Sequence, residues 1–182
     1  MHNNGFWVFG YGSLVWQPEF EFQERQIARL EGYARSFCMR SIHHRGTVAN
    51  PGLVLALDEA DSYCDGVAFF VAPDHAQTTL DALRERELIS SAYLEAVLPV
   101  SLRDGRRAEA VSHVIDRDHD QYCHLSLEGQ AQIIAGAQGG RGPNVDYLFN
   151  TATHLKELGL EDPDLTWLSN RVAEILAASG RG

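Results

Sequence analysis

Segments typical of β-strands come first in this chain, and segments typical of helices come later. Apolar runs at 94–102 and 107–115 flank Asp104-Gly105, a dipeptide that suits the tight turn of a hairpin. Further strands are predicted by short apolar runs at 7–9, 27–33, 53–57 and 66–71. This order lacks the regular strand–helix alternation of a doubly wound fold. It therefore predicts an α+β protein with an antiparallel sheet.

Three segments predict helices. The first is expected to be capped by Asp74 and to run to about Ser90, and the third follows Pro163. The second follows Pro143 and is expected to end at Gly159. On one side of the second helix we expect Val145, Leu148, Ala152 and Leu155. On one side of the third we expect Leu165, Leu168, Val172, Ile175 and Leu176.

The length and charge of the chain limit its class. A chain of 182 residues is expected to form one domain, 1–182, with a substantial core. Its net charge of −10 argues against nucleic acid and anionic lipid as partners. Three widely spaced cysteines form no disulfide pattern, and no signal peptide or apolar run of membrane-spanning length is present. We therefore expect a cytoplasmic protein.

A polar segment, Gly10-Tyr11-Gly12-Ser13, interrupts an apolar run near the N-terminus. A dinucleotide-binding fingerprint is excluded because Val15 stands where its third glycine belongs and no helix is expected to follow. Two interpretations stay open. The segment is either a simple bulge or turn, or a cradle whose backbone N–H groups face an anion, with Ser13 adding a hydroxyl and Tyr11 an aromatic wall.

An acidic residue, Glu87, falls on the apolar side of the first predicted helix. At 100° per residue it lies roughly 20° from Leu80, whereas Glu85 lies on the opposite side. A carboxylate that points inward is costly unless paired, and desolvation raises its pKa toward the range of a general base. The alternatives are a buried ion pair, with Arg84 or with an arginine of a strand, and a helix that ends before Glu87.

A metal site is not expected. The eight histidines include no HExxH motif, and histidines and cysteines do not occur at zinc-ligand spacing.

Five blocks of sequence carry a family resemblance: residues 7–16, 45–47 with 50–52, 66–68, 86–87 with Tyr93, and 142–149. In this order they resemble the ChaC family of glutathione-specific γ-glutamylcyclotransferases. The blocks span most of the chain. The position of Glu87 on the apolar side of its helix favours it over Glu85 as the match to the catalytic glutamate of the family.

The resemblance implies a γ-glutamylcyclotransferase-like α+β fold, a small, mostly antiparallel β-barrel with surrounding helices. It implies conversion of glutathione to 5-oxoproline and cysteinylglycine, with no metal or organic cofactor. Glu87 is expected to be the general acid/base, taking a proton from the α-ammonium group and returning one to the departing amide nitrogen. The expected substrate-binding residues are Val8, Phe9, Gly10, Tyr11, Gly12, Ser13, Leu14, Arg45 and Tyr147.

Alternatives remain for several of these roles. Residues 10–13 are expected to hold the γ-glutamyl group through backbone groups, and Arg45 either meets the glycine carboxylate of glutathione or stabilises its own loop. Tyr147 either reaches the substrate or is a core tyrosine with one hydrogen bond. For the whole chain, the alternatives are a cyclotransferase for other γ-glutamyl peptides or amines, and a γ-glutamyl-binding module without turnover.

Overall fold

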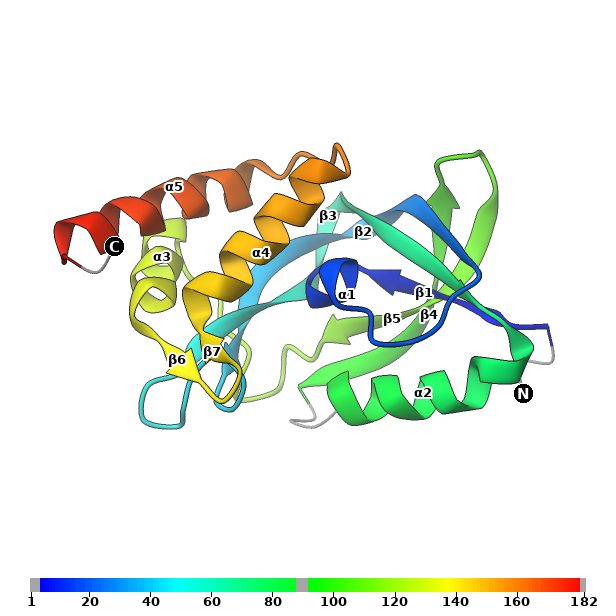
Figure 1. The fold of residues 1–182 in the computed structure, drawn as a ribbon, viewed down its shortest axis with the longest axis horizontal. Coiled ribbons are helices and arrows are strands. Elements are labelled where there is room, and N and C mark those ends of the chain that lie inside the picture. Colours follow the sequence, from blue (N-terminus) through cyan, green and yellow to red (C-terminus); the bar gives the residue numbers. More distant parts are fainter. Residues whose placement is uncertain (1–3, 88–91, 181–182) are drawn as a thin grey trace. The chain divides into compact units, whose positions relative to one another are not determined.

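The structure, a computed structural model, describes residues 4–87 and 92–180. In this part of the chain it contains a closed five-stranded barrel, a two-stranded hairpin and five helices (Figure 1). The strands are β1 Phe6–Gly10, β2 Glu24–Ser41, β3 Gly52–Val71, β4 Tyr93–Leu102, β5 Arg107–Ile115, β6 Gln138–Gly139 and β7 Gly142–Pro143. The helices are α1 Ser13–Trp16, α2 Pro73–Glu87, α3 Leu127–Gly136, α4 Asn144–Glu157 and α5 Pro163–Ala178.

Two compact units divide the chain. The first comprises Met1–Ser36 and Ala56–Asp120, and the second Phe37–Leu55 and Gln121–Gly182. The long strands β2 and β3 therefore contribute residues to both units. The expectation of a single domain stays a prediction.

The barrel has the strand order β1-β3-β2-β4-β5. Strand β1 pairs antiparallel with β3, from Phe6 opposite Val71 to Gly10 opposite Val67, and parallel with β5. The hairpin predicted around Asp104-Gly105 is confirmed as β4 and β5, and Gly105 adopts a φ of 94° that suits glycine in a tight turn. The predicted class, an α+β fold built on a small and mostly antiparallel barrel, is confirmed.

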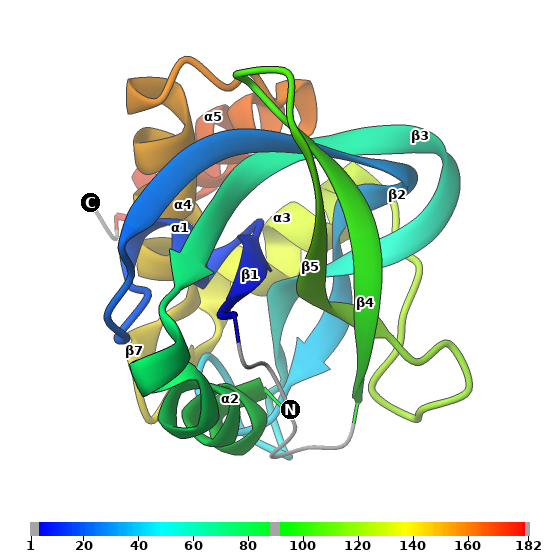
Figure 2. The ribbon, with the colours of Figure 1, turned by 90° about the vertical axis from the view of Figure 1, so that its right-hand side faces the viewer.

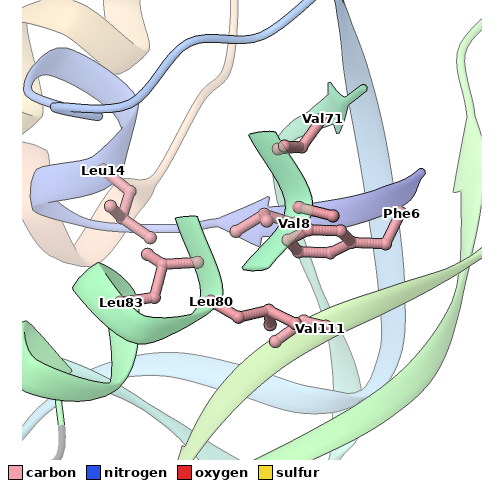
Figure 3. Close-up of a cluster of buried hydrophobic side chains, with 8 residues drawn as sticks. Phe6, Val8, Leu14, Val71, Leu80, Leu83 and Val111 are labelled. Carbon is pink, nitrogen blue, oxygen red and sulfur yellow. The ribbon is translucent and has the colours of Figure 1, made fainter. Parts of the chain in front are cut away.

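Helix α2 packs against β1 and β5 in the first unit. Figure 2, in which the barrel is seen end-on, shows α2 lying beside β1. A buried apolar cluster joins these elements: Phe6, Val8, Leu14, Val71, Ala76, Leu80, Leu83 and Val111 (Figure 3). The side chains of Leu80 and Leu83 at one-turn spacing meet those of Val8 and Val111, so the apolar face of α2 fixes the helix against the strand that leads into the glycine-rich segment.

In the second unit, α3, α4 and α5 pack against one another (Figure 1). The first residue of α4, Asn144, is fully buried and bonds the backbone of β3 in both directions. Its Oδ1 accepts from Leu53 N at 2.8 Å, and its Nδ2 donates to Leu53 O at 2.8 Å. A buried amide is tolerated here because both of its polar atoms are satisfied.

Some predicted strand boundaries were wrong. The runs 53–57 and 66–71 belong to one strand, β3, because the polar stretch between them continues in extended backbone. Within that stretch Asp58 is buried and accepts from Arg117 Nε at 2.7 Å, so a carboxylate inside the strand is neutralised. The expected strand 27–33 is likewise only a part of the longer β2.

The helices differ from the prediction in the start of α2 and in the presence of α3, and the structure adds which residues of α4 and α5 are buried. Helix α2 begins at Pro73, so Asp74 lies in its first turn rather than at its cap, and the expected continuation over 88–90 lies outside the described residues. Helix α4 buries Tyr147, Leu148, Thr151 and Leu155 together with Asn144, whereas Val145 and Ala152 are only partly buried. Helix α5 buries Leu165, Leu168 and Val172 but only partly buries Ile175 and Leu176. Helix α3, capped by Ser126, was not predicted.

Candidate active site

The glycine-rich segment lies between the end of β1 and a single turn of helix. Helix α1 begins at Ser13, with Val15 N donating to Gly12 O at 3.0 Å and Gln17 N donating to Ser13 O at 2.7 Å. The expectation that no helix follows the segment was therefore wrong. The first N–H groups of a helix have no partner inside the helix, so the glycine-rich segment leads into a turn whose first backbone donors need partners elsewhere.

The apolar side chains beside the glycines are core residues. Val8 and Phe9 are fully buried, and Leu14 belongs to the same apolar cluster as Val8. If these predicted substrate-binding residues contact a ligand, they do so through their backbone groups. Tyr11 is also buried, and its hydroxyl donates to His113 O at 3.0 Å; its role as an aromatic wall of the substrate site stays a prediction.

Arg35, on β2, holds the glycine-rich segment from the barrel side. Its Nε donates to Tyr11 O at 2.6 Å, and its Nη2 donates to Asp65 O. One guanidinium thus ties the backbone of the segment to β3. Sequence reasoning missed this residue, because its partners are carbonyl groups 24 and 30 positions away and carry no side-chain signal.

Glu87 is the last residue of α2, and its side chain is only 13% exposed. Glu85 is exposed. The inward position predicted from helical spacing is confirmed, and the alternative that the helix ends before Glu87 is wrong. Arg84 is not the partner of Glu87, since Arg84 bonds both carboxylate oxygens of Glu95 at 2.9 Å.

Arg86 connects Glu87 with the glycine-rich segment. Its Nε lies 3.4 Å from Glu87 Oε1, and its Nη2 donates to Ser13 Oγ at 2.9 Å. The carboxylate and the Ser13 hydroxyl therefore contact the same guanidinium. Sequence reasoning noted Arg86 only as part of a motif and gave it no role.

His113, on β5, is a buried histidine whose side chain nitrogen Nε2 has no hydrogen-bond partner among the described residues. Burial lowers the pKa of His113 to about 4, and of the charges facing it Glu95 on β4 opposes the shift while Arg84 on α2 adds to it. The neutral imidazole is thus the form that the folded protein accommodates.

Acidification is expected to destabilise the protein through His113. Because its folded pKa of about 4 lies below the ordinary 6.5, its contribution is complete above pH 6.5 and is lost as the pH falls toward 4. Linkage gives a loss of about 2 kcal/mol between pH 7 and pH 5. Urea unfolding at both pH values should show this loss in the wild type but not in His113→Leu; an equal pH dependence of the two proteins would contradict the assignment.

Arg45 and Tyr147 lie together in the second unit. Arg45 is buried, donates from Nη1 to Pro143 O at 3.1 Å, and lies 5.8 Å from the centre of the Tyr147 ring. Burial lowers the pKa of the Arg45 guanidinium, partly offset by Tyr147 and Asp146. No carboxylate lies within ion-pair distance of Arg45 among the described residues, so the nearby Asp146 compensates its charge only in part.

Tyr147 has the features expected of a core tyrosine with one hydrogen bond. It is buried, its ring packs edge-on against Phe37 at 5.9 Å, and its hydroxyl accepts from Leu55 N at 3.2 Å. Its contact with substrate stays a prediction.

Within 4–87 and 92–180, no group of three or more histidine, cysteine, aspartate or glutamate side chains is placed to hold a metal ion. Across the same residues, every helix is too short or too polar to cross a bilayer.

The architecture is that of the γ-glutamylcyclotransferase-like fold. A crystal structure of a γ-glutamyl cyclotransferase specific to glutathione from yeast superimposes with a TM-score of 0.86 at 25% identity, covering 94% of this chain and 97% of that one. A structure of YkqA from Bacillus subtilis, 18% identical with a TM-score of 0.61, shares the fold over 93% of this chain and 55% of its own.

Sequence comparison identifies the family. The family pattern described as ChaC-like protein matches residues 6–175. A glutathione-specific γ-glutamylcyclotransferase of Escherichia coli K12 is 37% identical over 94% of this chain and 74% of its own length. A glutathione-specific γ-glutamylcyclotransferase of Schizosaccharomyces pombe is 32% identical, with 87% of each chain covered. The chain belongs to the ChaC family, as its motifs predicted.

Proposed function

We propose that the chain is a γ-glutamylcyclotransferase that converts glutathione to 5-oxoproline and cysteinylglycine. The names of its relatives and the fold it shares with the yeast enzyme support the reaction class. The observation that carries the assignment is Glu87, an acid that is only 13% exposed and is joined through Arg86 to Ser13 of the glycine-rich segment. The Glu87–Arg86 ion pair alone would also suit a binding module, but only an enzyme needs Glu87 as a proton acceptor, so turnover distinguishes the two.

The reaction is an intramolecular aminolysis. The carboxylate of Glu87 takes a proton from the α-ammonium group of the γ-glutamyl unit, and the freed amine attacks the γ-carbonyl carbon. The attacking nitrogen then loses a second proton, and the amide bond to cysteine breaks as Glu87 returns the first proton to the departing nitrogen. The second proton also ends on that nitrogen, so cysteinylglycine leaves with an α-ammonium group. A five-membered lactam and free cysteinylglycine result, and no water is consumed.

Positioning supplies much of the rate in such a reaction. Holding both ends of the flexible γ-glutamyl chain raises the effective molarity of the amine at the carbonyl, which lowers the activation barrier by several kcal/mol. We assign residues 8–14 to this task through backbone groups, since the side chains of Val8, Phe9 and Leu14 are committed to the core. Backbone N–H groups of the same segment are the proposed donors to the oxyanion that forms at the γ-carbonyl.

The assay that tests this proposal compares two substrates. Purified protein is incubated with glutathione and with γ-Glu-Ala, and 5-oxoproline is quantified from each. Release from glutathione alone supports the proposal. Release from both indicates a cyclotransferase for γ-glutamyl compounds in general, and release from neither indicates a binding module.

Arg45 is the proposed contact of the glycine carboxylate, on the basis of its buried charge, which no carboxylate pairs directly within the described residues. We expect Arg45→Gln to raise the KM for glutathione by about tenfold with little change in kcat, because a contact made equally in the ground and transition states affects binding alone. Glutathione amidated at its glycine carboxylate is the control. Its KM should be the same for both proteins, and a tenfold rise with this analogue too would exclude the carboxylate contact.

We propose a cytoplasmic enzyme that acts without a cofactor. Its three cysteines are buried, and no disulfide joins them within the described residues, as a reducing compartment allows. The net charge of −10 also disfavours nucleic acid as a partner.

A further inference from the structure

Arg86 contacts three separate parts of the first unit although its side chain is only 11% exposed. We infer that Arg86 is a positioning residue for the cyclisation reaction, one that sets where the Glu87 carboxylate lies relative to the glycine-rich segment. This inference rests on the proposed function.

Each nitrogen of the guanidinium has its own partner. Nε lies 3.4 Å from Glu87 Oε1, and Nη2 donates to Ser13 Oγ at 2.9 Å. Nη1 donates to Gln17 O at 2.7 Å and to Glu19 Oε2 at 3.0 Å. A planar guanidinium fixes these directions relative to one another, which an ammonium group on a flexible stem does not do.

The contacts join elements that are far apart in the sequence. Arg86 and Glu87 close helix α2, whereas Ser13 opens α1, 73 positions earlier. The face of α2 that carries Leu80 and Leu83 already packs on β1, but Glu87 lies one turn beyond that cluster. The contacts of Arg86 therefore attach the last turn of α2, including Glu87, to the first unit beyond the apolar cluster.

The backbone conformation of Glu19 is a second observation that supports a fixed position for Arg86. Glu19 is the one non-glycine residue with positive φ, 60°, in the described chain. Such a conformation persists where surrounding contacts enforce it, and it is concentrated at functional sites. Here the Glu19 carboxylate accepts from Arg86 Nη1 and from Gln17 Nε2 at 2.9 Å, so the segment after α1 is shaped around the guanidinium.

The alternative roles of Arg86 predict different kinetics. A residue that only supports the fold would lower stability without changing the kcat of the folded enzyme. A residue that binds the substrate carboxylate directly would raise KM. A positioning residue lowers kcat, since a displacement of about 1 Å at the reacting groups can reduce the rate on the order of a hundredfold.

The test uses Arg86→Met and Arg86→Lys, with Arg84→Met as the matched control. Arg84 lies on the same helix but pairs with Glu95 at an exposed position. Thermal melting and circular dichroism report folding, and 5-oxoproline release at varied glutathione concentration gives kcat and KM. We expect kcat to fall 10- to 100-fold in Arg86→Met and less in Arg86→Lys, with KM within threefold of the wild type and Arg84→Met unchanged.

A folded Arg86→Met protein with wild-type kcat would overturn the inference, as would a raised KM at unchanged kcat. If Arg86→Met does not fold, Arg86→Lys decides by the same criterion. Failure of the proposed function has a different signature, because the wild type itself would then release no 5-oxoproline.

Discussion

Replacing Glu87 with glutamine is expected to abolish the release of 5-oxoproline from glutathione, lowering kcat by at least a thousandfold. Glutamine has the same shape and fits the space of a side chain that is 13% exposed. It cannot take a proton from the α-ammonium group, and loss of a general acid/base costs on the order of 10²–10⁴-fold in rate. Both proton transfers of the reaction depend on this one group, so the upper part of that range applies.

The matched control is Glu85→Gln, two positions earlier on the same helix and exposed. It should keep wild-type kcat and KM. Calorimetric titration should show that Glu87→Gln still binds glutathione and melts within a few degrees of the wild type. Turnover by the glutamine variant at a rate near that of the wild type would remove Glu87 from the mechanism.

Gly66→Ala is expected to lower both stability and activity. A Cβ atom at Gly66 would lie 2.3 Å from Gly10 O and 2.9 Å from the Phe9 ring. The backbone of β1 must move to admit it, and overpacking of this kind costs about 1–3 kcal/mol. Because the displaced atoms lead directly into residues 10–13, kcat is expected to fall by roughly ten- to a hundredfold in the protein that remains folded.

Gly136→Ala is the control for this substitution, since no atom lies within 4 Å of its expected Cβ. Its unfolding free energy should be unchanged or slightly higher, because alanine favours a helix more than glycine does. Urea unfolding measures stability, and 5-oxoproline release measures activity. If Gly66→Ala behaves like Gly136→Ala, the packing between β3 and the end of β1 does not constrain the site.

The sequence predicted the structure best where the pattern lies within one helix or one hairpin. The inward position of Glu87 followed from 3.6-residue spacing and needed no knowledge of the partner elements. The hairpin of β4 and β5 followed from its turn residues, and Gly159 ended α4 as expected, with a φ of 73°. The class of fold followed from the order of such elements.

What the sequence could not give depends on contacts between distant elements. Three apolar residues after the glycines form the turn of α1, although the same residues suit a strand equally well. The polar centre of β3 continues as a strand whose side chains at 59–63 are largely exposed, and its buried Asp58 is matched by Arg117, 59 positions later. The roles of Arg35 and Arg86 are of the same kind, since each is defined by its partners and not by its neighbours in the chain.

The paired hydrogen bonds of Asn144 have a consequence for the chemical ageing of the protein. Deamidation would exchange the Nδ2 donor for an oxygen and would set a carboxylate against the carbonyl oxygen of Leu53. A change of one atomic mass unit would thus turn an attraction into a repulsion inside the protein, at the first residue of α4. Damage at this asparagine would therefore weaken the attachment of α4 to β3, although no surface residue had changed.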